Sequence, residues 1–71
     1  MQISGKVVYV DLSGGFWGIE GRNGQQYRPV NGLPSAYQKQ GLRVQARVTP
    51  ASGMSIFMWG KQVNILEINT L

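Results

Sequence analysis

The chain has 71 residues, a length that allows one domain with a single small hydrophobic core. It contains no cysteine and no histidine, which excludes disulfides, thiol redox chemistry and the usual ligands of zinc, haem and iron–sulfur sites; we expect no cofactor and no metal. Seven basic and three acidic side chains give a formal net charge of +4, which favours an acidic partner such as nucleic acid or an anionic membrane surface. A generally basic soluble domain would have the same composition, so charge alone does not identify the partner.

No segment is long and apolar enough to span a bilayer, for which about 20 residues are needed, so we expect no transmembrane segment. Residues 1–5 lack the basic and apolar regions of a secretory signal. We therefore expect a cytoplasmic protein if Met1 is the native start, and a protein of the bacterial envelope if a signal peptide has been removed.

The first third of the chain predicts two strands. Residues 3–12 are rich in β-branched and aromatic side chains, which favour a strand, and they end at the turn signal of residues 13–15. Residues 16–20 predict the second strand.

A hairpin follows, because Asn23-Gly24 can adopt the positive φ angles of a two-residue type I′ turn. In the register that such a turn sets, Glu20 faces Tyr27. A strand glycine marks a bend or a close approach, so we expect the hairpin to curve at Gly18. One face then carries Trp17, Ile19, Arg28 and Val30, and the other carries Phe16, Glu20, Tyr27 and Pro29. Both faces are mixed, and the pattern does not say which one is buried.

The middle of the chain predicts a short helix and a fourth strand. Residues 34–40 fit one or two helical turns, with Pro34 in the first turn and Gly41 as the C-terminal cap. Residues 42–48 alternate strictly between apolar and polar side chains, which is typical of a strand with one buried face. The predicted core residues of this strand are Leu42, Val44, Ala46 and Val48.

Residues 54–59 predict a fifth strand and residues 62–68 a last one. An open sheet of this size would leave long strand edges exposed, so closure is favoured. The sequence therefore predicts one all-β domain over residues 1–71, a small closed five- to six-stranded OB-like barrel with one short helix between strands 3 and 4.

Five segments together resemble a family of small bacterial and archaeal OB-like domains. They are residues 11–19, 27–34, 41–44, 58–60 and 63–68, which span nearly the whole chain. Members of that family occur alone or in small envelope lipoproteins and have no established activity. The resemblance implies the fold and carries no active site over to this chain.

Catalysis is not expected. The common hydrolytic mechanisms need a nucleophile with a base, a pair of carboxylates or a metal. This chain offers only Asp11, Glu20 and Glu67, without histidine or cysteine. We therefore expect a binding module and not an enzyme.

Aromatic rings interleaved with basic side chains are typical of OB-type proteins that bind single strands. The candidate ligand-binding residues of this kind are Trp17, Arg22, Tyr27, Arg28, Phe57, Trp59 and Lys61. The same rings could instead fill the core, since a small barrel needs large side chains. Arg43 and Arg47 share one strand face, where they could meet phosphates or guard the strand against edge pairing.

Two functions remain open at this point. The first is a protein-interaction or accessory module that docks or self-associates through the apolar segment 54–59, which the family resemblance also favours. The alternative is weak, sequence-tolerant binding of single-stranded nucleic acid through the hairpin of strands 2 and 3.

Overall fold

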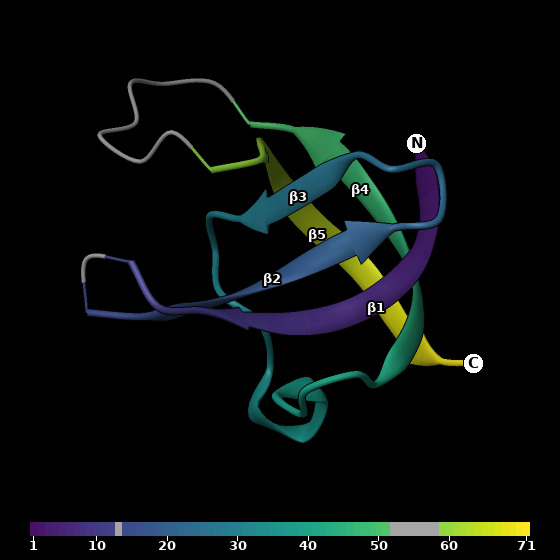
Figure 1. Ribbon diagram of the computed structural model, residues 1–71. Helices are drawn as coiled ribbons and strands as arrows, with labels where there is room; N and C mark the ends of the chain where they lie inside the picture. The colour runs from purple at the N-terminus through teal and green to yellow at the C-terminus, as the bar shows by residue number, and fades with distance from the viewer. Residues whose placement is uncertain (13, 52–58) are drawn as a thin grey trace.

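The computed structural model describes residues 1–12, 14–51 and 59–71, and within them five strands close into a barrel. The strands are β1 (Gln2–Val10), β2 (Phe16–Gly21), β3 (Gln26–Pro29), β4 (Arg43–Pro50) and β5 (Lys61–Thr70). They follow one another round the barrel in the order β1-β2-β3-β5-β4 (Figure 1). The β3 and β5 strands are parallel, and the other neighbours are antiparallel. The predicted class, a small closed all-β barrel, is confirmed.

Two of the sequence predictions concern the C-terminal third. The predicted last strand is β5, which is longer than expected at both ends. Of the strand predicted over 54–59, residues 54–58 lie outside the described residues, and Trp59 belongs to a bend before β5.

The core is built from inward-facing residues of all five strands and from Leu33, which follows β3. Because successive side chains of a strand point to opposite faces, every second residue enters the barrel from Ile3 to Val7 in β1 and from Val44 to Val48 in β4. The buried apolar residues are Ile3, Val7, Ile19, Tyr27, Leu33, Val44, Ala46, Val48 and Val63, with Leu42 partly buried beside them. The core face predicted for the fourth strand is confirmed.

The predicted hairpin register is wrong by one residue. Ile19 pairs with Tyr27, whereas the two-residue turn had placed Glu20 there. Gly21 and Gln25 close the loop between β2 and β3, because the Gly21 amide donates to the Gln25 carbonyl at 2.8 Å. Three residues lie inside this pair, and the last of them, Gly24, has a φ of 86°. A turn followed by a glycine with positive φ is the usual form of such a loop. The Asn23 Oδ1 atom accepts a hydrogen bond from the Gln25 amide at 3.0 Å and so holds this longer loop.

A shift of one residue exchanges the faces of a strand. In the observed register, Ile19 and Tyr27 enter the core together. The two mixed faces of the predicted hairpin are thereby sorted into an apolar inner face and an outer face that carries Phe16, Gly18, Glu20 and Arg28.

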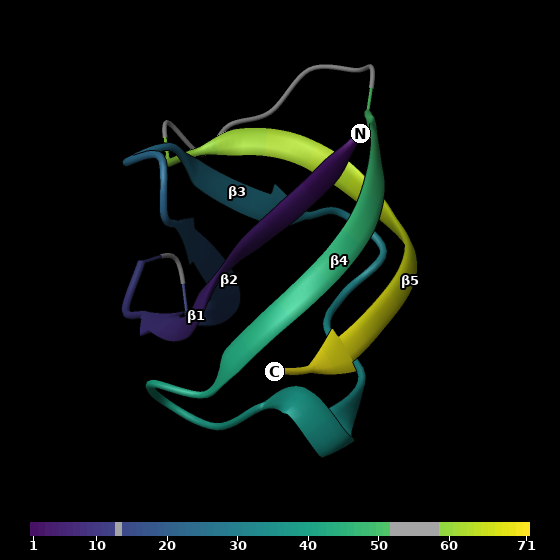
Figure 2. The ribbon, with the colours of Figure 1, turned by 90° about the vertical axis from the view of Figure 1, so that its right-hand side faces the viewer.

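The predicted helix over 34–40 is also wrong in length and type. The described chain forms only one 3-10 turn there, η1 (Ser35–Tyr37), which lies below the barrel (Figure 1) and near the end of β5 (Figure 2). The Tyr37 hydroxyl donates to the Ile68 carbonyl at 3.1 Å. The turn ends at Gln38, whose ψ of 70° is not helical. The Gly41 amide then donates to the Val7 carbonyl at 2.7 Å and joins the following residues to β1.

β5 bends strongly round the barrel (Figure 2), and a register shift opposite Arg47 and Val48 leaves Leu66 as an extra, exposed residue. Beyond the short β3–β5 ladder, the side chain of Asn31 takes the place of a strand. Its Nδ2 donates to the Ile65 carbonyl and its Oδ1 accepts from the Ile65 amide, each at 3.3 Å. This reciprocal pair helps to close the barrel where β3 ends.

Candidate ligand-binding face

An aromatic cluster lies on the outer face of β2 and β3. Phe16 is the first residue of β2, and its ring meets Trp59 edge to face, with the ring centres 5.5 Å apart and the planes at 68°. The guanidinium carbon of Arg28 lies 5.3 Å from the centre of the Phe16 ring, within the range of a cation–π contact. We call Phe16, Arg28 and Trp59 the aromatic cluster.

Gly18 makes this cluster possible. A Cβ atom at this position would lie 2.5 Å from Trp59 Cζ3 and would also clash with Cη2 of the same ring. Only a residue without a side chain lets the indole lie directly on β2. Trp59 therefore fixes the chain just before β5 against the outer face of the sheet.

A basic pocket lies further along the same outer face, over β1. In the strand pairing, Lys6 of β1 is flanked by Glu20 of β2 and by Arg43 of β4. The Lys6 Nζ atom lies 3.9 Å from Glu20 Oε1. The Arg22 amide donates to the Ser4 carbonyl at 2.9 Å, which places the Arg22 side chain beside this row. The pocket measures about 340 Å³, and its lining residues are Gly5, Lys6, Glu20, Gly21, Arg22, Arg43 and Leu71.

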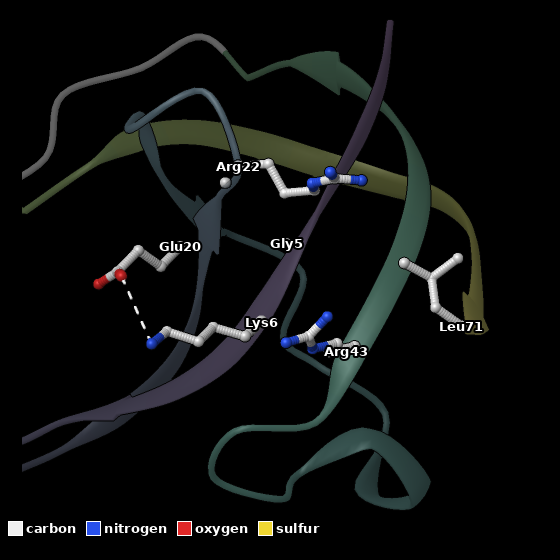
Figure 3. A pocket seen from close by; sticks show the side chains of 7 residues that line it. Gly5, Lys6, Glu20, Arg22, Arg43 and Leu71 are labelled. Carbon is white, nitrogen blue, oxygen red and sulfur yellow. Dashed lines mark ion pairs between the residues drawn. The ribbon is translucent and has the colours of Figure 1, made fainter.

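The charge in this pocket is unbalanced. It contains three cations and one carboxylate, and Figure 3 shows the Lys6 ammonium turned toward Glu20 while Arg22 and Arg43 reach toward β1 at Gly5. Outside the pocket, Arg47 forms an ion pair with Glu67, in which Arg47 Nη2 lies 4.0 Å from Glu67 Oε1. Where β1, β2 and β4 meet, three cationic side chains thus share a single carboxylate side chain.

The structure places the candidate residues of the sequence in different surroundings. Tyr27 is 3% exposed and lies in the core, and half-buried Trp17 packs against that core with its ring edge to face with Tyr9, the centres 5.1 Å apart. The Tyr27 ring is therefore closed to stacking, and Trp17 lies on the opposite face of β2 from the aromatic cluster. Arg28 and Trp59 belong to the aromatic cluster.

Arg22 lines the basic pocket. Lys61 is exposed and is the first residue of β5, where it pairs with Tyr27 of β3. Phe57 lies outside the described residues. Sequence reasoning missed Phe16, Lys6 and Arg43 as members of one face. The correct hairpin register would have placed Phe16 with Arg28, whereas Lys6 and Arg43 meet only through barrel closure.

Among the described residues there is no group of three or more acidic, histidine or cysteine side chains that could hold a metal ion. Within the same residues, no helix is long and apolar enough to cross a membrane. Comparison with protein-family models, curated proteins and solved structures found no match for this chain.

Proposed function

We propose that the chain is a non-enzymatic, OB-type binding module that holds single-stranded nucleic acid on the outer face of β1, β2 and β3. The observation that carries this proposal is that the aromatic cluster and the basic pocket share one face. Proteins that bind single strands without sequence preference combine a positive path for phosphates with rings for the bases. The face formed by strands 2 and 3 is also the one that OB-type barrels use for oligonucleotides.

In this proposal each part of the face has a separate role. Lys6, Arg22 and Arg43 attract phosphates, and Phe16 with Trp59 supplies an apolar surface for a base. Phe16 and Glu20 are four residues apart on β2, or about 13 Å at roughly 3.3 Å per residue, so one flexible strand can contact both ends of the face.

A protein partner is the preferred expectation from the sequence, and it rests on the family resemblance and on the apolar segment 54–59. Only Trp59 of that segment is described, and it packs on β2. The large exposed apolar side chains of the described chain are distributed over several elements, and they are Met1, Tyr9, Leu12, Val30, Leu66 and Leu71. The described residues therefore favour nucleic acid over a protein partner.

The proposal is tested by the anisotropy of fluorescently labelled single-stranded DNA and RNA of mixed sequence, titrated with the protein over a series of salt concentrations. Each phosphate contact to a single strand contributes a slope of about −0.7 to log K against log salt. Three contacts, from Lys6, Arg22 and Arg43, give a slope of about −2.1, or a loss of roughly 20-fold between about 50 and 200 mM salt.

Two arginine-to-glutamine variants compare the loss of a cation inside the basic pocket with the loss of one outside it. Arg43→Gln should weaken binding and reduce the slope by about 0.7, because one phosphate contact is lost. Arg47→Gln removes the same charge from the same strand outside the pocket and should leave the slope nearly unchanged. Absence of oligonucleotide binding at low salt, or equal effects of the two variants, would contradict the proposal and make a protein partner the better explanation.

A further inference from the structure

We infer that the basic pocket is a site for a phosphate monoester, such as the phosphorylated end of a nucleic-acid strand. The part of this inference that concerns a nucleic-acid strand rests on the proposed function. The affinity of the pocket for the phosphate group itself does not depend on it.

The first argument is the arrangement of like charges. Lys6 and Arg43 are direct cross-strand neighbours of β1 and β4. Like charges placed opposite one another on a sheet are destabilising. Glu20 faces Lys6 from the other side, but Arg22 adds a third cation to the same pocket. A bound anion would offset this repulsion, so the arrangement fits a ligand better than it fits an empty surface.

The second argument is the amount of charge. Among the side chains that line the pocket, three cations and one carboxylate leave two positive charges. A phosphate monoester carries about −1.5 to −2 charges near pH 7, whereas an internal phosphodiester of a strand or a carboxylate carries one. The monoester therefore matches the pocket more closely than an internal phosphate does.

The third argument is geometry. Arg22 and Arg43 approach β1 at Gly5 from different elements (Figure 3), and a guanidinium presents its N–H donors as a planar fork that fits phosphate oxygens. The backbone at both arginines is fixed, because the Arg22 amide donates to Ser4 and the Arg43 carbonyl accepts from the Leu71 amide at 2.9 Å. The volume of about 340 Å³ leaves space for a phosphate together with part of its sugar.

The first experiment follows backbone amide and arginine side-chain resonances by NMR during titration with inorganic phosphate and, separately, with a nucleoside monophosphate. We expect saturable shifts at Lys6, Arg22 and Arg43 and none at Arg47. Arg43→Gln should weaken the response by about three- to tenfold, because exposed ionic contacts are partly screened by solvent. Arg47→Gln is the matched control and should respond as the unsubstituted chain does.

The second experiment compares oligonucleotides that carry a 5′-phosphate, a 3′-phosphate or no terminal phosphate. One phosphorylated end should bind about three- to tenfold more tightly than the unphosphorylated strand, and Arg43→Gln should abolish this difference. If strands bind equally with and without a terminal phosphate, and inorganic phosphate causes no shift in the pocket, the inference is wrong while the proposed function stands. If inorganic phosphate or the monophosphate binds in the pocket and no strand binds, the proposed function is wrong and the site takes a small phosphate monoester.

Discussion

The Gly18→Ala substitution tests whether Trp59 is held on β2 by the absence of a side chain at position 18. A Cβ atom at this position would overlap the indole ring and would lie 3.3 Å from the Tyr27 carbonyl oxygen. The indole is the more mobile neighbour, so we expect the substitution to displace Trp59 and to separate it from Phe16.

The expected loss of stability follows from the contacts of the ring. An edge-to-face aromatic pair contributes about 0.5–1.5 kcal/mol beyond its buried area. A half-buried ring that becomes exposed loses about 1 kcal/mol of burial, roughly half of the value for a fully buried side chain. Alanine is more favourable than glycine in a strand by about 0.5–1 kcal/mol, which offsets part of this. The net destabilisation expected for Gly18→Ala is about 0.5–2 kcal/mol.

The assay is a double-mutant cycle by urea denaturation with Gly18→Ala, Trp59→Ala and the pair. When Trp59 is already absent, Gly18→Ala should be neutral or stabilising by about 0.5 kcal/mol, because only the backbone effect remains. In a Trp17→Phe background, the emission of Trp59 alone should shift to longer wavelength on Gly18→Ala. Equal destabilisation in both backgrounds would refute the reasoning and would place the strain at the β3 backbone.

Two further substitutions test how the barrel closes. Gly5→Ala should destabilise the fold by about 2–3 kcal/mol, because a Cβ atom would meet the backbone carbonyl of Glu20, which cannot turn away as a side chain can; thermal unfolding measures this, and an unchanged midpoint would contradict the close approach of β1 and β2. Asn31→Asp should cost about 1 kcal/mol, because a carboxylate cannot donate to the Ile65 carbonyl. Hydrogen exchange at the Ile65 amide should accelerate in this variant, and unchanged exchange would show that the Asn31 side chain does not close the barrel.

Much of the fold could be predicted from local patterns. The strand β4 was predicted with its correct buried face because Val44, Ala46 and Val48 alternate with polar residues without interruption. The predicted register of the hairpin is wrong because one hydrogen bond, from the Gln25 amide to Asn23 Oδ1, favours a three-residue loop over a two-residue turn. A register depends on such a bond, and a shift of one residue reverses every face.

The prediction of a helix over residues 34–40 is wrong because of tertiary contacts. Residues 34–40 have the local signals of a helix, but Tyr37 is bound to β5 and Gly41 to β1, and these contacts override local preference. The two partners, Ile68 of β5 and Val7 of β1, lie far from residues 34–40 in the sequence, so local patterns do not reveal these contacts.

The candidate site could be predicted only in part. A glycine inside a strand indicates a close approach, and Gly18 does have such a neighbour, but nothing near it in the sequence identifies Trp59. Lys6 and Arg43 become neighbours only when β1 pairs with β4. Arg28 was predicted for the binding face by its chemistry, although the predicted register gave it the wrong neighbours.

The central claim, that the outer face of β1, β2 and β3 binds single-stranded nucleic acid, is tested most directly by mapping the site. Backbone amide resonances of the isotope-labelled protein would be followed during titration with an unlabelled single-stranded oligonucleotide at low salt. We expect saturable shifts at the aromatic cluster and at the basic pocket, with Arg47 and Glu67 of the β4–β5 face unchanged. No shifts, or shifts confined to the β4–β5 face, would contradict the claim.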